Sequence, residues 1–195
     1  MAKTGILIGM TFCCVAIGVW IGLQFAPQPA TNPAYSGLGG NFILRSPTGK
    51  TVSLEDAQGQ VVLVYFGYTH CPDVCITALN KISRALDSLP PQLSNQVQPF
   101  FISLDPERDT PEKLAAYGRN FDPRIQSLTG TPEQIRAVAK RYFIAYQKFP
   151  HAATYRLDHS SVMYLLDRSG KVVRLVHTVE SSEDLANALL QVLQS

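Results

Sequence analysis

The chain carries little charge for its length. Lysine, arginine, aspartate and glutamate make up 16% of the 195 residues, whereas a typical soluble domain carries about 25%. The formal net charge is only +2, so the sequence lacks the basic surface that binding to nucleic acid requires. It also lacks internal repeats. We therefore expect neither a repeat architecture nor a nucleic-acid partner.

Charge is missing altogether near the start of the chain. The 22 residues Gly5–Ala26 are uncharged, and after Lys3 the next charged side chain is Arg45. At about 1.5 Å per residue, a helix of this length crosses the roughly 30 Å core of a bilayer. We expect a single transmembrane anchor over residues 5–26. Positive charge precedes this anchor, so residues 1–4 should be cytoplasmic and the rest of the chain periplasmic, at the inner membrane.

A cleaved signal peptide is the alternative interpretation of this segment. Against it, the apolar run is longer than the hydrophobic core of about 7–15 residues in such peptides, and no clear cleavage site follows. The segment has no arginine-rich stretch before it, so a mitochondrial transit peptide is not indicated. Cys13 and Cys14 lack the sequence context of a lipoprotein attachment site, and we interpret them as apolar membrane residues.

A short tether should join this anchor to one folded domain. Residues 27–40 read PQPATNPAYSGLGG and contain three prolines, three glycines and no charge. Such a composition makes a poor core and a good linker. We therefore place the domain at residues 41–195, which is long enough to bury a sizeable core.

The domain should begin with a hairpin and a central strand. Phe42–Leu44 and Thr51–Leu54 flank the turn Ser46–Gly49, which indicates two paired strands. Val61–Phe66 is a continuous apolar run rich in strand-forming residues. Such a run predicts a strand that is buried on both faces.

The remaining elements alternate in a recognisable order. Pro72 and Asp73 suit the first turn of a helix that continues with apolar residues at helical spacing. We further predict a strand over Gln98–Leu104, helices opening at Thr110 and Thr131, strands over Ser161–Leu166 and Lys171–His177, and a last helix from Ser181 or Ser182 to Leu193. A parallel strand–helix–strand half followed by an antiparallel pair and a terminal helix is the thioredoxin arrangement. We predict an α/β, thioredoxin-like fold, with a central mixed sheet flanked by helices.

Two cysteines, Cys71 and Cys75, stand where the buried strand turns into its helix. Their spacing places both side chains on one face if the helix begins between them. The pair can form a disulfide or bind a soft metal as thiolates, and a helix N-terminus favours the thiolate in either case. The alternatives are two buried structural cysteines or a permanent disulfide, although so short a loop would constrain the unfolded chain little.

A third ligand would come from the four histidines. His70 adjoins the first cysteine, His151 lies in an irregular stretch, and His177 ends an apolar strand. His159 lies just before a predicted strand, and the neighbouring Asp158 could orient its imidazole. Spacing alone does not decide among them, because each could equally be a satisfied surface or core group.

Three stretches, Tyr65–Cys75, Leu104–Thr110 and Asp158–Ser160, resemble the signature sequences of Sco/SenC proteins. They occur in the family's order and spacing, behind a single predicted anchor. The resemblance covers nearly all of the exported domain. It implies a membrane-anchored, thioredoxin-fold, copper-binding protein of cytochrome c oxidase assembly.

Carried over by position, the resemblance implies that Cys71, Cys75 and His159 bind one copper ion, as Cu(I) or Cu(II). Asp158 would support the histidine or the fold as a second-shell residue. The sequence departs from the family where Ile76 replaces the usual proline after the second cysteine. This change removes no ligand, so the expected copper site is unaffected.

The resemblance implies a metallochaperone, without turnover of its own, that delivers copper to the binuclear copper centre of cytochrome c oxidase. The alternative is a thiol–disulfide oxidoreductase that reduces the copper-ligand cysteines of the oxidase subunit. Both would use Cys71 and Cys75, but a pure reductase has no need of His159. The expected partners are the copper-centre subunit of a respiratory oxidase, a copper donor, a thiol reductant, and the membrane through the N-terminal helix.

Two sequence features favour copper over the reductase. Thioredoxins normally use two cysteines separated by two residues, whereas three residues separate them here, and no proline lies between Tyr155 and Tyr164. Two further hypotheses rank lower. A closed zinc site would need a fourth ligand, for which His70 is the candidate. A peroxidase of this fold would need a different arrangement around Thr69.

Overall fold

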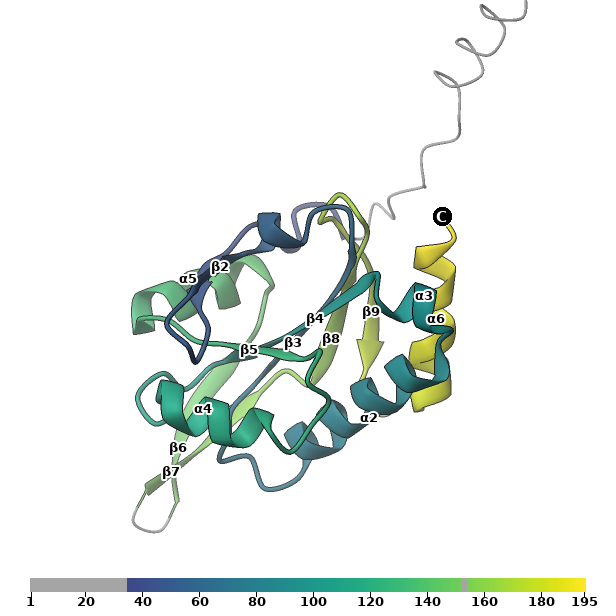
Figure 1. Ribbon diagram of the computed structural model, residues 1–195. Coiled ribbons are helices and arrows are strands. Elements are labelled where there is room, and N and C mark those ends of the chain that lie inside the picture. Colours follow the sequence, from purple (N-terminus) through teal and green to yellow (C-terminus); the bar gives the residue numbers. More distant parts are fainter. Residues whose placement is uncertain (1–34, 152–153) are drawn as a thin grey trace, which may run out of the picture. The chain divides into compact units, whose positions relative to one another are not determined.

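The computed structural model describes residues 35–151 and 154–195 (Figure 1). The predicted cytoplasmic residues 1–4, anchor 5–26 and most of the tether 27–40 lie outside the described residues. Within the part of the chain that is described, no helix is both long and apolar enough to cross a membrane.

A five-stranded mixed sheet forms the centre of the domain. Its order is β5 (Gln126–Leu128), β4 (Val97–Ser103), β3 (Val61–Gly67), β8 (Val162–Leu166) and β9 (Val172–His177). The strands β3, β4 and β5 are parallel, whereas β8 is antiparallel to both β3 and β9. This is the predicted combination of a parallel half with an antiparallel pair.

Helices cover both faces of the sheet. α2 (Val74–Ser88), α4 (Pro111–Gly118) and α6 (Ser182–Leu193) lie on one side, and α5 (Pro132–Arg141) lies on the other (Figure 1). A short α3 (Pro91–Ser94) leads into β4. α5 opens at Thr131 as predicted and has a capping box, in which Thr131 accepts from the amide of Gln134 while the Gln134 side chain accepts from the amide of Thr131.

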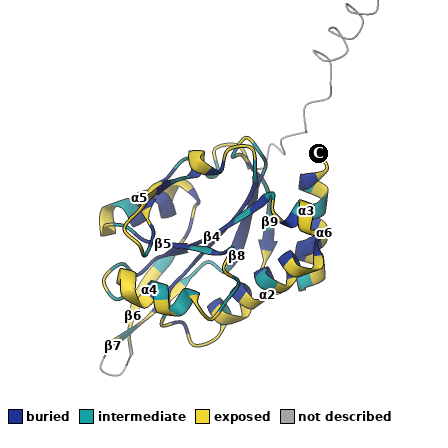
Figure 2. Cartoon of the chain, viewed as in Figure 1, coloured by how far each residue is buried: buried dark blue, intermediate teal, exposed yellow. Residues whose placement is uncertain are grey.

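The core lies between these layers. All seven residues of β3 are buried, as a strand covered on both faces requires. Buried residues gather in the central strands and on the inner sides of α2 and α6 (Figure 2). The apolar stripe predicted for α2 is buried as well; it comprises Cys75, Ala78, Leu79, Ile82, Ala85 and Leu86.

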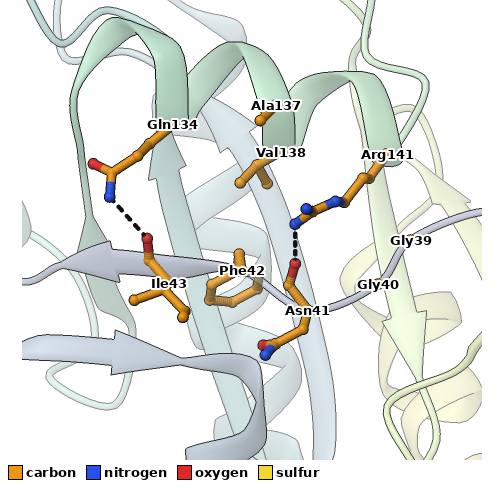
Figure 3. Close-up of a pocket in the computed structure, with 9 residues that line it drawn as sticks. All are labelled: Gly39, Gly40, Asn41, Phe42, Ile43, Gln134, Ala137, Val138 and Arg141. Atoms are coloured by element: carbon orange, nitrogen blue, oxygen red, sulfur yellow. Dashed lines mark hydrogen bonds between the residues drawn. The ribbon is translucent and has the colours of Figure 1, made fainter.

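The N-terminal hairpin is present as predicted. β1 (Ile43–Arg45) pairs with β2 (Thr51–Ser53) in antiparallel register, and the turn of 3₁₀ helix η2 (Leu54–Ala57) follows. Two side chains of α5 bind the backbone of this segment: Gln134 donates to the carbonyl of Ile43 at 3.4 Å, and Arg141 donates to that of Asn41 (Figure 3).

The structure differs from the sequence-based prediction in two places that matter for function. α2 begins at Val74, two residues after Pro72, because the preceding chain forms a turn in which the amide of Cys71 donates to the carbonyl of Tyr68. In addition, an unpredicted hairpin of β6 (Tyr146–His151) and β7 (Thr154–His159) extends beyond the central sheet (Figure 1). β7 ends on His159.

Candidate metal centre

The end of β3 and the first turn of α2 hold the two cysteines. Cys71 lies in the loop between them and is 6% exposed, whereas Cys75 lies in the first turn of α2 and is fully buried. Both are free thiols. The structure therefore places the pair at the positive end of a helix, as predicted, on the side of the sheet that α2 covers.

The two sulfurs differ in their environment. The backbone amide of Cys75 donates to Sγ of Cys71 at 3.4 Å. The neighbouring Cys75 thiol, followed by the His159 side chain and by such backbone donors, lowers the pKa of Cys71 to about 4 against the effect of burial. The same contact with Cys71, followed by burial, raises the pKa of Cys75. The reduced pair thus holds one thiolate, at Cys71, and one thiol, at Cys75, near neutral pH.

His159 comes to this pair from a position 84 residues further along the chain than Cys75. Its Nε2 lies 3.6 Å from Sγ of Cys75, and its Nδ1 lies 2.9 Å from the carbonyl oxygen of Ser160. A carbonyl oxygen only accepts hydrogen bonds, so Nδ1 carries a proton, and Nε2 is directed at the cysteines. The ring is therefore oriented so that Nε2 is the nitrogen that could bind a metal together with the sulfurs.

Aromatic side chains enclose the three residues. The ring of His159 makes edge contacts with Tyr65 and Tyr68, at centroid distances of 6.5 and 5.9 Å. The hydroxyl of Tyr65, which is fully buried, donates to Sγ of Cys75 at 3.6 Å. Burial raises the pKa of Tyr65, so this hydroxyl stays a donor.

Gly67 gives the site its close packing. A Cβ at this position would lie 2.8 Å from Sγ of Cys75 and 2.8 Å from Phe101. Sequence reasoning missed both this glycine and Tyr65. A glycine that ends an apolar strand is a signal for close approach of another group, and it could have identified Gly67.

Asp158 does not orient the imidazole in this structure, which corrects one of its two predicted roles. Neighbouring residues of a strand point to opposite faces, so Asp158 faces away from His159, toward solvent. Its carboxylate pairs with Nε of Arg156 at 2.8 Å. The carbonyl of Ser160 holds the ring instead.

His70 and His177 bind other partners. Nδ1 of the exposed His70 lies 3.1 Å from the hydroxyl of Thr69 and 3.7 Å from the carboxylate of Asp109. His70 therefore faces Asp109, which weakens its candidacy as a fourth zinc ligand. His177 ends β9, where its amide donates to Glu180. The side chain of His151 is not among those described.

Cys71, Cys75 and His159 lie near one another but do not form a complete metal site. Among the described side chains, no group of three or more His, Cys, Asp or Glu residues is already set as a metal cluster. Cys71, Cys75 and His159 are held together by hydrogen bonds, and binding of a metal would replace the proton of Cys75.

Comparison with known proteins identifies the family. The sequence matches SCO1/SenC over residues 30–194. The chain belongs to the SCO1/SenC family. Protein sco1 of Schizosaccharomyces pombe is 38% identical to it over 156 residues, which cover 78% of this family member and 59% of the relative. The chain spans 46% to 59% of the length of three eukaryotic relatives.

Solved structures of relatives confirm the predicted thioredoxin-like fold. ScoI of Bradyrhizobium japonicum, whose structure contains copper, is 38% identical with a TM-score of 0.74, and the match covers 80% of this chain and 99% of that one. BsSco, a member of the Sco family of cytochrome c oxidase assembly proteins in which a disulfide switch is described, is 25% identical with a TM-score of 0.66. That match covers 86% of this chain and 99% of BsSco.

Proposed function

We propose that this protein binds one copper ion through Cys71, Cys75 and His159 and delivers it to the binuclear copper centre of a respiratory cytochrome c oxidase. Copper is the cargo of this activity. Three protein ligands leave one coordination position open. Through this position the ion can pass to a ligand of the partner protein.

The contact between Cys75 and His159 carries the proposal. Two ligands that bind one ion at about 2.3 Å (sulfur) and about 2.0 Å (nitrogen), at a tetrahedral angle, are about 3.5 Å apart. The observed separation of Sγ and Nε2 is 3.6 Å. The geometry of this contact therefore suits two ligands of one ion.

The chemistry of the donors favours copper. Thiolates select Cu(I), and an imidazole suits Cu(II) as well. The relative from B. japonicum contains copper, and BsSco belongs to a family of cytochrome c oxidase assembly proteins. Both relatives support the assignment of this chain to copper delivery for an oxidase.

The test is a copper titration of the reduced, purified full-length chain, followed by visible absorption and electron paramagnetic resonance. We expect a one-to-one complex with sulfur-to-Cu(II) charge-transfer bands. His159→Ala should weaken or alter this complex, because it removes the nitrogen ligand. His177→Ala, a matched change at the end of β9, should leave it unaltered. Equal spectra for both variants would refute the ligand set.

A second candidate function is a thiol–disulfide reductase, which the unequal pKa values of the two cysteines favour. The thiolate of Cys71 would attack a disulfide in the oxidase subunit to form a mixed disulfide, and Cys75 would then lose its proton and displace the subunit as a dithiol. Cys71 and Cys75 end as a disulfide, and an external thiol reductant must restore them. Rapid disulfide exchange without copper binding would favour this function.

We also propose a location that suits copper delivery. An anchor at residues 5–26 would hold the domain at the periplasmic side of the inner membrane, near an oxidase that is itself membrane-bound. Protease added to intact spheroplasts should then digest the domain. Protection of the domain until the membrane is lysed would contradict this orientation.

A further inference from the structure

The proposed ligands come from two separate elements. Cys71 and Cys75 belong to the loop and helix that follow β3, whereas His159 belongs to the β6–β7 hairpin, which lies outside the central sheet. The hairpin's position therefore decides whether three ligands or two are present. Something must fix the hairpin relative to the cysteines, and the loop between β4 and α4 contacts both.

At one end of that loop, Asp109 holds the segment that leads to Cys71. This carboxylate is almost fully buried and accepts three hydrogen bonds. The amide of Thr69 donates to it at 2.9 Å, the hydroxyl of Thr69 at 2.6 Å and the hydroxyl of Ser103 at 2.6 Å. Thr69 lies two residues before Cys71, so Asp109 fixes the backbone on which the first cysteine stands.

At the other end, Asp105 holds the hairpin. Its carboxylate is fully buried, accepts from the hydroxyl of Tyr155 at 2.6 Å and pairs with Nε of Arg108 at 2.5 Å. The guanidinium of Arg108 lies 3.6 Å from the centroid of the Tyr155 ring and donates to the Tyr155 carbonyl at 2.8 Å. It also donates to the hydroxyl of Thr154 at 3.2 Å. These contacts form a clamp on the first residues of β7.

β7 links the clamped residue Tyr155 to His159 at the metal centre. Residues that alternate along a strand share one face, and Tyr155, Leu157 and His159 all face the body of the domain. Leu157 is buried. Tyr155 is four residues from His159, a span of about 13 Å at roughly 3.3 Å per residue. A shift or rotation at Tyr155 therefore moves the imidazole relative to Cys75.

We propose that the loop Asp105–Asp109 sets the separation between the cysteines and His159, and that Arg108 and Tyr155 are positioning residues for the copper site. This inference rests on the proposed function. The loop acts as a spacer: Asp109 holds the cysteine side, and Asp105 with Arg108 holds the histidine side. Binding of Cu(II) depends on the imidazole and is therefore sensitive to the position of the hairpin. Binding of Cu(I) is less sensitive, because both thiolates still hold the ion.

The test is a double-mutant cycle on Cu(II) affinity, measured by competition with a chelator on the full-length chain. Tyr155→Phe removes the hydroxyl that binds Asp105 and keeps the ring that Arg108 covers. We expect it to lower Cu(II) affinity by about 10- to 100-fold, the range for groups that orient metal ligands, with Cu(I) affinity nearly unchanged. In the His159→Ala background the same change should have no further effect.

Tyr164→Phe is the matched control. It removes a buried hydroxyl that donates to the carbonyl of Tyr142 at 2.7 Å, away from the cysteines. Its Cu(II) affinity should equal that of the wild type. If Tyr155→Phe fails to fold, Arg108→Lys gives the same cycle, since it keeps the charge and loses the planar fork.

The outcomes separate the two proposals. An equal loss for Tyr155→Phe in both backgrounds, or no loss at all, overturns the positioning role while the ligand set stands. The same loss for Tyr164→Phe also overturns it, because the effect is then one of stability. If the Cu(II) complex of His159→Ala equals that of the wild type, the proposed function is overturned, and this inference is overturned with it.

Discussion

The domain has two hairpins outside its central sheet, and they are held in opposite ways. The hairpin β1–β2 buries Leu44 and Val52, with Phe42 beside it, against the core, and α5 binds the adjoining backbone. In β6–β7, Leu157 is the one buried residue among the described side chains. The second hairpin is held instead by a cation–π contact and a few hydrogen bonds to the β4–α4 loop.

The two hairpins therefore differ in their main contribution: the first stabilises the domain, and the second positions a ligand. Apolar burial is large and non-directional, so the first hairpin contributes to the free energy of unfolding and has one position. Hydrogen bonds and ion pairs are directional and smaller in net effect. The hairpin that carries His159 therefore contributes less to the free energy of unfolding, and its contacts mainly set where the imidazole lies.

The largest expected effect is on the first hairpin. Phe42 is 1% exposed, and its ring packs edge-on against Phe100 at 5.5 Å. Phe42→Ala should lower the free energy of unfolding by about 3–5 kcal/mol, measured with urea, while the folded fraction keeps its copper stoichiometry. Leu157→Ala should lower the free energy of unfolding by less than Phe42→Ala does, and it should weaken Cu(II) binding. Equal effects on both quantities would abolish the distinction.

A glycine pair sharpens the comparison. Gly130→Ala places a Cβ 2.8 Å from the flexible end of Gln134 and 3.0 Å from Leu44, beneath the first hairpin. Gly67→Ala places one 2.8 Å from Sγ of Cys75. Gly67→Ala should cost about 1–3 kcal/mol through overpacking and shift the Cu(II) spectrum, whereas Gly130→Ala should cost less and leave the spectrum unaltered. A Gly67→Ala complex identical to wild type would argue against this packing.

The metal-centre region should also carry a pH dependence that the first hairpin lacks. The pKa of Cys71 is lowered from 9.0 to about 4 in the folded, reduced protein, mainly by the Cys75 thiol. Between these values the unfolded chain binds more protons at Cys71, so its contribution to stability grows as pH rises and is lost as pH falls toward 4. Above pH 9 the raised pKa of Cys75 reverses the trend.

Urea unfolding of the reduced protein across this pH range checks the expectation. Cys71→Ser should flatten the rise in stability between about pH 4 and pH 9, whereas Phe42→Ala should lower the whole curve without changing its slope. A rise that survives in Cys71→Ser would assign the dependence to another group.

The smallest effect should come from the exposed contact of the second hairpin. Nζ of Lys148 lies 2.7 Å from the carboxylate of Glu107, and both side chains are substantially exposed. Lys148→Ala should change the free energy of unfolding by less than about 1 kcal/mol and leave Cu(II) affinity unaltered. A large loss of affinity would show that Lys148, whose Nζ also lies 4.7 Å from the centroid of the Tyr155 ring, is needed to position the hairpin.

The sequence was sufficient wherever a pattern repeats over several residues. It predicted β3 from an apolar run, α2 from its stripe and the first hairpin from its turn. It could not predict β6–β7, because most of that hairpin is exposed, Pro150 interrupts the pattern of β6, and the alternation in β7 spans only a few residues. Contacts with a loop about 50 residues earlier in the chain hold it in place.

The metal centre divides in the same way. The cysteine pair follows from local spacing at a strand–helix junction, whereas His159 was singled out only by resemblance. The Ser160 carbonyl that orients its ring is a backbone atom, and every residue has one, so no sequence pattern could reveal it. The orienting role predicted for Asp158 was wrong, because neighbouring residues of a strand face opposite sides and the carboxylate points away from His159.

The two buried carboxylates of the β4–α4 loop also constrain how sequences of this kind can change in length. An insertion at an exposed turn, such as residues 48–50 between β1 and β2, lengthens the surface and leaves the interior alone. An insertion between Asp105 and Asp109 would alter the distance between two anchors at once. We therefore expect evolution to vary the length of the chain freely around this segment and to keep the segment itself at constant length for as long as a lineage retains copper.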